Sequence, residues 1–312
     1  MSRKIIIDTD PGQDDAVALL LALAAPEDLD ILAITTVAGN VPLPLTTINA
    51  LKTVELAGRP EVPVHSGCDR PLRRELVTAE YVHGRTGLDG ADLPEPSIAP
   101  APQHAVDRMI DLVMSHPPGS ITLCPLGPLT NVATALLRQP DVAGRIAEIV
   151  LMGGGFFEGG NTTAAAEFNI YVDPHAADAV FRSGVPITVM PLDVTHKALI
   201  LPRHLERFAA LGTRVGEAVH GLLAFYERYD VEKYGMEGGP LHDPCVIAFL
   251  LRPQLFGGRQ IHVAVETASE LTMGMTVADW WGMSGLPANA TWMRDVDSEG
   301  FFDLLLEHIA RL

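Results

Sequence analysis

The sequence predicts an α/β fold: a Rossmann-like, open and mostly parallel sheet flanked by helices, with extra helices toward the C-terminus. Short apolar runs alternate with helical stretches over most of the chain, which is typical of parallel sheets with helical crossovers. Glycine or polar turns follow directly after several of these runs, as they do at the ligand-binding edge of such sheets. Of the 312 residues, 47% are hydrophobic, which is enough for a large core. We expect a single domain spanning residues 1–312.

The expected strands are apolar runs bounded by turn residues, at Lys4–Asp8, Ile31–Val37, Val62–Val64, Ser120–Cys124, Ile146–Met152 and Pro186–Met190. The expected helices lie between them, at Asp14–Ala25, Leu43–Gly58, Gln103–Ser115, Leu129–Arg138 and Pro174–Ser183. Because the alternation resumes after it, the proline-rich segment Leu93–Pro102 is expected to be a loop. Toward the C-terminus we expect helices over Pro202–Tyr234 and Asp243–Leu251, short strands at Ile261–Glu266 and Ala290–Asp295, and a final helix.

Composition and charge exclude several classes of protein. A formal net charge of −17, without a lysine and arginine stripe, argues against a nucleic-acid partner. No apolar stretch reaches the roughly 18 to 20 residues that a spanning helix needs, so no membrane partner is expected. The start of the chain lacks the features of a signal peptide. Cys68, Cys124 and Cys245 lack metal-type spacing and fit reduced thiols in the core of a cytoplasmic protein.

Four aspartates crowd the turn between the first expected strand and the first expected helix: Asp8, Asp10, Asp14 and Asp15. Carboxylates this close repel one another, so they need a cation, a shared proton or full solvation. Hard oxygen ligands on a rigid turn suit Ca²⁺ or Mg²⁺ better than zinc. The sequence therefore predicts a divalent-cation site at this turn, with Asp8 at the strand end supporting it.

Polar or glycine turns also follow three other expected strands. Asn40 follows the second strand, residues 127–131 follow the Ser120 strand, and residues 153–155 follow the Ile146 strand. Ligands of open parallel sheets bind at the carboxyl ends of the strands. One shared site at that edge is the simplest prediction.

Several further signals each leave two interpretations open. Asp243 precedes Pro244 at the start of an apolar helix, and it is either a helix N-cap or a metal ligand, roles that do not exclude one another. Glu167, Phe168 and Asn169, with Asn161, form either a solvated loop or a grip for a sugar.

Two segments are candidates for the mouth of the site. The glycine-rich segment 82–90, which includes His83, is a weak candidate for a mobile flap. The aromatic residues of 225–234, among them Tyr226 and Tyr234, form either a packed helix face or the mouth of the site. Phosphate-loop and Gly-x-Ser-x-Gly motifs are absent from the sequence.

Together these motifs resemble the Ca²⁺-dependent nucleoside hydrolases, the nucleoside N-ribohydrolases. The most specific element is Asp8-Thr-Asp-Pro-Gly-Gln-Asp-Asp-Ala16. The segments 37–40, 127–131, 152–155, 167–169 and 241–244 follow in the order and spacing of the family. The resemblance covers essentially the whole chain, and the stretch from Tyr234 to Pro244 is most similar to the branch that favours pyrimidine ribonucleosides.

The resemblance implies roles for individual residues. Ca²⁺ would be held by Asp10, Asp15, Asp243 and the backbone carbonyl of Leu126, a position where the family often has threonine. The ribose would be held by Asp14, Asn40, Asn161, Glu167 and Asn169, with Met152 beneath the sugar. His242 would help the base to leave. His83, Phe168, Tyr226 and Tyr234 complete the residues that we expect to contact the substrate.

The implied reaction is hydrolysis of the N-glycosidic bond of ribonucleosides, with uridine and cytidine preferred, to free base and ribose. A Ca²⁺-bound water would be activated by Asp10 and would attack through an oxocarbenium-like transition state. The resemblance also implies a homotetramer or a homodimer.

Two alternatives remain at this point. One is a HAD-type Mg²⁺ phosphatase, because Asp8-Thr-Asp10 imitates its Asp-x-Asp motif, although the continuation of the sequence disfavours it. The other is a non-catalytic nucleoside- or Ca²⁺-binding protein of the same fold, although both Asp10 and Asp14 are retained.

Overall fold

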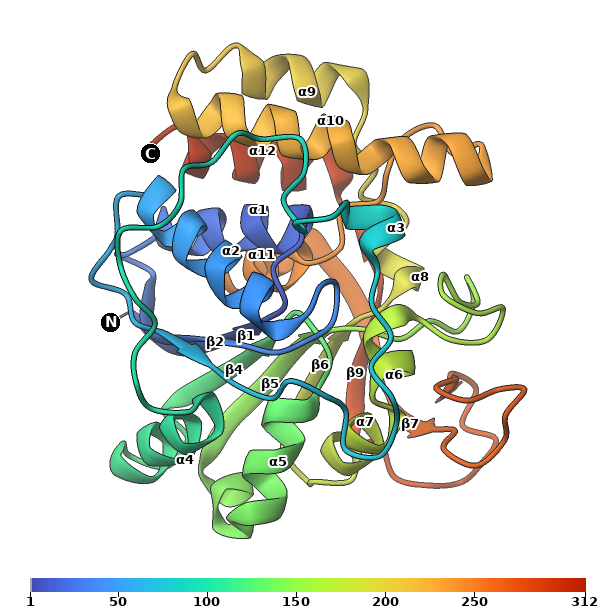
Figure 1. Cartoon of the computed structure of the whole chain (residues 1–312). Helices are drawn as coiled ribbons and strands as arrows, with labels where there is room; N and C mark the ends of the chain where they lie inside the picture. The colour runs from blue at the N-terminus through green and yellow to red at the C-terminus, as the bar shows by residue number, and fades with distance from the viewer. Residues whose placement is uncertain (1) are drawn as a thin grey trace.

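A computed structural model describes residues 2–312, apart from the side chains of Asp230 and Tyr234. It contains a nine-stranded sheet with the order β3-β2-β1-β4-β5-β6-β9-β7-β8 (Figure 1). The strands are β1 Arg3–Thr9, β2 Leu29–Thr36, β3 Val64–Ser66, β4 Ile121–Pro125, β5 Ile146–Met152, β6 Ile187–Met190, β7 Phe256–Val265, β8 Thr276–Asp279 and β9 Ala290–Val296.

The first six strands are parallel and follow the order 3-2-1-4-5-6 of doubly wound α/β folds. The strand β9 extends this sheet in parallel with β6, whereas β7 runs antiparallel to both β9 and β8. Because β1 lies between β2 and β4, the acidic turn that follows β1 is at the topological switch point of the sheet, where such folds bind their ligands.

Helices cover both faces of the sheet (Figure 1). On one face, α1 Gln13–Leu23 packs against α2 Leu43–Leu56 and α11 Pro244–Leu251, with α10 Arg214–Tyr234 and α12 Ser298–Ile309 beyond them. On the other face lie α4 Ala105–Ser115, α5 Thr130–Arg138 and α7 Pro174–Phe181. The helix α9 Pro202–Ala209 packs on α10 in the outer layer.

The helix α1 is buried on all sides, because neighbouring helices cover the face that it turns away from the sheet. Every one of its residues, Gln13–Leu23, is buried. Its near-continuous apolar sequence is what such a central helix needs. None of the helices in the described part of the chain is both long enough and apolar enough to cross a membrane.

The predicted α/β class and the parallel sheet are confirmed, with most elements shifted by only one or two residues at their ends. The strand predicted at Val62–Val64 instead begins at Val64, because the N–H of Val62 closes a turn onto the Arg59 carbonyl and Pro63 has no N–H. Besides two 3₁₀ helices, Pro140–Arg145 and Pro253–Leu255, four short strands and α-helices were not predicted: β8, α3 Glu80–His83, α6 Phe168–Val172 and α8 Leu192–Thr195. Each of these four has four or five residues, too few for a periodic pattern.

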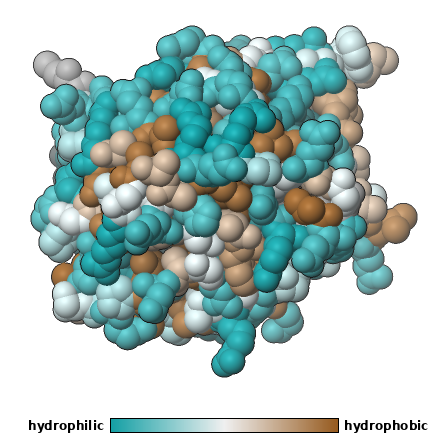
Figure 2. Space-filling view, turned by 90° about the horizontal axis from the view of Figure 1, so that it is seen from above, coloured by the Kyte–Doolittle hydropathy of each residue, from teal (hydrophilic) through white to brown (hydrophobic). Residues whose placement is uncertain are grey.

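The surface above the outer helices is predominantly hydrophilic, with hydrophobic residues scattered among the polar ones (Figure 2). The three cysteines are free thiols, with Cys124 and Cys245 buried and Cys68 partly buried. This agrees with the expected packing role.

Candidate active site

A pocket lies at the carboxyl edge of the parallel strands. Most of the predicted site residues line it: Asp14, Asn40, His83, Leu126, Met152, Asn161, Glu167, Phe168, Asn169, Tyr226, His242 and Asp243. None of the described residues that line the pocket is a lysine or an arginine, so it lacks the cation that a phosphate-binding site would offer.

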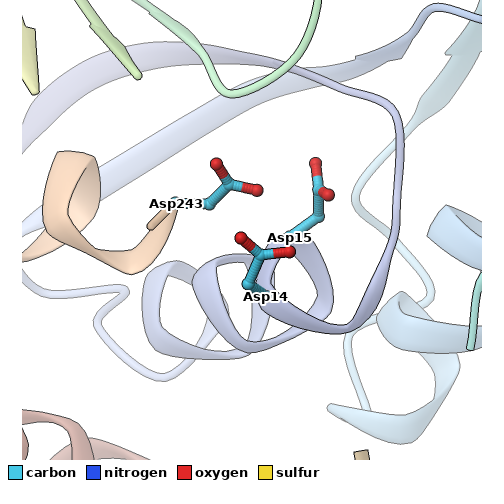
Figure 3. A group of neighbouring side chains, drawn as sticks. All are labelled: Asp14, Asp15 and Asp243. Carbon is cyan, nitrogen blue, oxygen red and sulfur yellow. The ribbon is translucent and has the colours of Figure 1, made fainter. Parts of the chain in front are cut away.

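Three carboxylates converge beside the pocket floor (Figure 3). Asp14 and Asp15 lie in the first turn of α1, and Asp243 directly precedes α11. Each contributes an oxygen, and these oxygens lie within 4.8 Å of one another. Although Pro244 occupies the first turn of α11, the Asp243 side chain makes no capping hydrogen bond. Its carboxylate instead faces Asp14 and Asp15.

Asp15 is held rigidly by its own turn. Its Oδ1 accepts a hydrogen bond from Thr9 Oγ1 at 2.5 Å, and its Oδ2 accepts from the N–H of Gly12 at 2.9 Å. The side-chain amide of Asn40, from the loop after β2, also donates to Oδ2 at 3.1 Å. The turns after two neighbouring strands are thereby joined at one carboxylate.

Asp10 does not line the pocket and is not part of the three-carboxylate group, but its N–H donates to Asp15 Oδ1 at 3.3 Å. Its Oδ2 accepts from the N–H of Asn40 at 2.7 Å, whereas its buried Oδ1 has no hydrogen-bond partner. A Cβ atom on Gly39 would lie 2.0 Å from Oδ2, and one on Gly127 would lie 2.1 Å from Oδ1. Glycine at these two positions therefore makes the room that the carboxylate occupies.

The electrostatics of this cluster favour a bound cation. Burial raises the pKa of Asp14 to about 8, helped by the charge of Asp15. Burial also raises the pKa values of Asp10 and Asp243 well above the ordinary range, and neighbouring aspartates add to both shifts. Buried carboxylates that repel one another need a positive charge to stay ionised, and the unpartnered Asp10 Oδ1 is an oxygen that such a charge would satisfy. The residues present thus fit a divalent cation with oxygen ligands.

The carbonyl of Leu126 lies at the same edge, directly after β4. Its N–H donates to the Asp8 carbonyl at 2.7 Å, and its carbonyl oxygen accepts from Asn169 Nδ2 at 2.7 Å. The second lone pair of this oxygen remains available. Only a backbone atom is required here, so leucine in place of threonine is compatible with the expected role.

Three of the sugar-binding candidates, Asn161, Glu167 and Asn169, come from the segment between β5 and α7. Glu167 is buried and accepts hydrogen bonds from the N–H groups of Gly154 at 2.9 Å, Asn169 at 2.9 Å and Ile170 at 3.2 Å. Burial nevertheless raises its pKa to about 7. Glu167 is the N-cap of α6, which explains why this segment is an ordered wall rather than the solvated loop that remained an alternative.

Asn169, Asn161 and Met152 complete that wall. Asn169 Nδ2 lies 3.3 Å from both the carbonyl oxygen and the Sδ of Met152. Asn161 Oδ1 accepts from the N–H of Phe168 at 3.0 Å, which ties the loop after β5 to α6.

The remaining candidates, His83, Tyr226 and His242, come from three further segments that border the pocket. Tyr226, on α10, places its hydroxyl 3.4 Å from Asp14 Oδ2 and its ring 5.7 Å from that of His83. His242 Nδ1 lies 2.7 Å from Thr195 Oγ1. Burial lowers the pKa of His242 well below its ordinary value, and the neighbouring His196 and His83 add to this shift. The side chain of Tyr234 lies outside the described part of the structure.

Asp8 is buried beneath the site and does not line the pocket. Its Oδ1 accepts from Thr35 Oγ1 at 2.6 Å and Asn131 Nδ2 at 2.8 Å, so it joins β1 to β2 and to α5. Its Oδ2 has no partner, and burial raises the pKa of Asp8 to about 7. These contacts agree with the supporting role expected for it.

Sequence reasoning missed three pocket residues, Ala79, Tyr81 and Thr162. Val82 and Tyr229, from the two segments proposed for the mouth of the site, also line the pocket. The rings of Tyr81, on α3, and Tyr229, on α10, lie 5.5 Å apart. Tyr229 belongs to the aromatic run already noted, but the unpredicted α3 left Tyr81 without any signal.

Known proteins are similar to this chain in sequence and in fold. Residues 5–303 match the family described as "Inosine-uridine preferring nucleoside hydrolase". The chain is 50% identical over 311 residues to the pyrimidine-specific ribonucleoside hydrolase RihA of Photobacterium profundum, with 99% of each chain covered. A plant nucleoside hydrolase, PpNRh1, superposes with a TM-score of 0.92 at 36% identity, covering 99% of both chains.

A purine-preferring ribonucleoside hydrolase from Gardnerella vaginalis also superposes with a TM-score of 0.92, at 32% identity, over 99% of this chain and 98% of that one. Membership of the family disfavours both alternatives, the phosphatase and the non-catalytic binding protein. The chain therefore belongs to the nucleoside hydrolase family, and it is a hydrolase with the nine-stranded fold of its relatives.

Proposed function

We propose that this enzyme hydrolyses the N-glycosidic bond of pyrimidine ribonucleosides, uridine and cytidine, with Ca²⁺ as its metal. The observation that carries the proposal is the convergence of buried carboxylates and a set of polar side chains at one pocket. The pyrimidine preference is supported by 50% identity to a pyrimidine-specific relative, against 32% to a purine-preferring one.

The metal would be held by Asp10, Asp15, Asp243 and the carbonyl of Leu126. Asp14 is close enough to Asp15 and Asp243 to share in its binding. When bound, a divalent cation supplies positive charge that anchors vicinal hydroxyls and lowers the pKa of water. Calcium is favoured over magnesium because the donors come from separate turns and include a carbonyl, which suits its larger and more flexible coordination.

The protein's own residues then perform the proton transfers. Asp10 Oδ1, which has no hydrogen-bond partner, accepts the proton of the water that attacks C1′. The C1′–N bond breaks as the C1′–O bond forms. The buried carboxylates stabilise the positive charge that develops on the ribosyl ring. Glu167, Asn169, Asn161 and Asn40 hold the sugar hydroxyls in place, with Met152 below the ring.

The departing base carries negative charge, and His242 is the proposed hydrogen-bond donor to it. Because burial keeps His242 neutral at pH 7, it stabilises that charge through a hydrogen bond from Nε2–H and keeps its own proton, while the base takes up a proton from solvent and Asp10 returns its proton there. That tautomer requires the Thr195 hydroxyl to donate to His242 Nδ1, across the observed distance of 2.7 Å. Thr195 is therefore proposed to fix the tautomer of His242 through its hydrogen bond to Nδ1.

The test is a panel of ribonucleosides with release of free ribose as the readout, with and without a chelator. Uridine and cytidine should be hydrolysed faster than inosine, and chelation should abolish turnover until Ca²⁺ is restored. Faster hydrolysis of inosine would overturn the pyrimidine preference. Full activity in the chelator would overturn the metal requirement.

We further propose a cytoplasmic homo-oligomer, a tetramer or a dimer. Support for association comes from large apolar side chains exposed around β8: Leu271 is 86% exposed, Trp281 75% and Met283 85%. Exposed apolar groups of this size often mark protein contacts. Light scattering on the purified protein tests this proposal, and a monomer at all concentrations would contradict it.

A further inference from the structure

A buried glutamine connects the acidic turn to the pocket wall. Gln13 is the first residue of α1, between Gly12 and Asp14, and it is fully buried. Its Nε2 donates to the backbone carbonyls of His83 at 2.9 Å and Asp89 at 3.0 Å. Its Oε1 lies 2.7 Å from His83 Nδ1. All of these hydrogen bonds of the amide are therefore made to the single segment 83–89.

The partners determine which way this amide points. Both backbone carbonyls can only accept hydrogen bonds, so the side-chain nitrogen has to face them. The opposite orientation would set the Gln13 oxygen against two other oxygens and lose two hydrogen bonds. With the nitrogen so placed, Oε1 faces His83 Nδ1. Because a carbonyl oxygen only accepts, Nδ1 must carry the proton.

The His83 ring is fixed in place on the pocket wall. It packs against the turn at Gly12, where a Cβ atom would lie 2.3 Å from Nδ1. The ring lines the pocket, and burial lowers its pKa to about 3, so it is neutral at pH 7. A neutral imidazole carries only one proton. Nε2, on the other side of the ring from Gln13, therefore has a free lone pair.

We propose that Gln13 is a positioning residue that holds His83 in the Nδ1–H tautomer, so that His83 Nε2 accepts a hydrogen bond from a donor group of the nucleoside. The inference rests on the proposed function and adds a specificity element to it. Nucleosides offer two kinds of donor, a ribose hydroxyl and an N–H of the base. In this tautomer His83 Nε2 has no proton with which to hydrogen-bond the leaving base, which leaves that role to His242.

The tautomer itself can be measured without any substrate. Long-range proton–nitrogen NMR correlations of the full-length, calcium-loaded protein distinguish the two tautomers, and the His83→Gln variant assigns the signals. The wild-type protein should show a proton on Nδ1 and a bare Nε2. In Gln13→Met, which keeps the length of the side chain but has no amide, the ring should change to Nε2–H or to a mixture.

Asn49 provides a matched control. It is buried, and its Nδ2 donates to the carbonyls of Pro11 at 2.9 Å and Thr86 at 2.7 Å, so it ties down the same segment without touching the His83 ring. Asn49→Ser should therefore leave the tautomer unchanged. An Nε2–H tautomer in the wild-type protein would overturn the proposal. An equal change of tautomer in both variants would also overturn it.

Substrate analogues then identify the donor. 5′-Deoxyuridine lacks a sugar hydroxyl, and 3-methyluridine lacks the base N–H. One of them should lose kcat/KM by roughly two- to twelvefold relative to uridine, the worth of one neutral hydrogen bond. That penalty should disappear in Gln13→Met and persist in Asn49→Ser. Penalties that are unchanged in Gln13→Met would refute the specificity role. Failure of the wild-type protein to cleave uridine at all would instead count against the proposed function, and the NMR result would stand apart from it.

Discussion

At the scale of single residues, Asp10 and Asp15 show how hydrogen bonding separates two carboxylates of one turn. Asp15 accepts from Thr9, Gly12 and Asn40, so both its oxygens are held. Asp10 keeps one buried oxygen without a partner. An oxygen in that state is suited to take up a proton or a cation. The spacing of the motif alone could not make this distinction.

The substitution Asp10→Asn should lower kcat for uridine by about 10²- to 10⁴-fold, because the amide cannot accept a proton from water. The measurement is ribose release at saturating Ca²⁺, so that weakened metal binding does not dominate the result. Asp8→Asn is the matched control, since the amide oxygen can still accept from Thr35 and Asn131. Asp8→Asn should lower kcat for uridine by less than about tenfold. Near-normal turnover of Asp10→Asn would refute the assigned base.

His83 should make stability dependent on acidity. Burial lowers its pKa to about 3 in the folded protein, below the ordinary value of 6.5. The unfolded chain therefore binds the proton first, so this contribution to stability is complete above pH 6.5 and is lost as the pH falls toward 3.

Acidification from pH 7.5 to pH 5 should consequently lower the unfolding free energy of both proteins. The decrease in His83→Gln should be about 1–2 kcal/mol smaller than the decrease in the wild-type protein. Urea unfolding at the two pH values measures the difference. His262→Gln, at a half-buried position on β7, is the comparison. Identical pH sensitivity of His83→Gln and the wild-type protein would show that burial does not keep His83 neutral.

At the scale of elements, the loop between β5 and α6 is ordered by one buried residue of α8. Asp193 Oδ1 accepts from the N–H groups of Phe156, Phe157 and Glu158, and its Oδ2 accepts from Trp292 Nε1 at 2.8 Å. This loop carries Asn161 to the pocket. Sequence periodicity did not reveal Asp193, because its partners are backbone groups distant in the chain.

The substitution Asp193→Ala should destabilise the protein by about 2–4 kcal/mol, because it leaves buried donors unpaired. It should also raise KM for uridine more than it lowers kcat, since the loop positions a sugar contact and not a reacting group. Thermal unfolding and steady-state kinetics measure the two effects. Asp178→Ala, which removes only the exposed pair with Arg182, should cost about 0.5 kcal/mol or less. Equal effects of the two substitutions would contradict the anchoring role.

At the scale of the whole molecule, the proposed metal site joins the first crossover of the sheet to a helix late in the chain. Asp10 and Asp15 come from the turn after β1, whereas Asp243 precedes α11, which packs against α1. A cation bound between them would tie the first crossover to the C-terminal helical layer. Without it, the buried carboxylates repel one another across the same contact.

Metal removal should therefore lower the melting temperature of the entire protein. Adding Ca²⁺ at about 100 times its dissociation constant should restore about 2.7 kcal/mol, which is roughly 4 °C for a chain of 312 residues. Scanning calorimetry with chelator and with stepwise add-back of Ca²⁺ and Mg²⁺ measures this shift. Calcium should give the larger stabilisation at equal concentration, and a melting temperature unaffected by either ion would contradict the proposed site.

The sequence by itself determined the α/β class, the parallel strands and the acidic turn, because these depend on short-range periodicity and on residues adjacent in the chain. It also placed Asn40 at the carboxyl edge of the sheet, because parallel strands end on one side, whereas Glu167 and Asn169 were left with two interpretations. Short elements such as α3 and α6 could not be predicted from the sequence, because four or five residues are too few to show a periodic pattern of apolar residues.

Only the tertiary structure decided what each polar atom faces. It turned the Asp243 carboxylate toward Asp14 and Asp15 rather than onto its own helix, left Asp10 Oδ1 without a partner, and set Gln13 against His83. These contacts join residues from 70 to more than 200 positions apart in the chain, so no local pattern specifies them. Burial makes these contacts decisive. The ionisation of a carboxylate or an imidazole that is removed from water depends on the few groups around it.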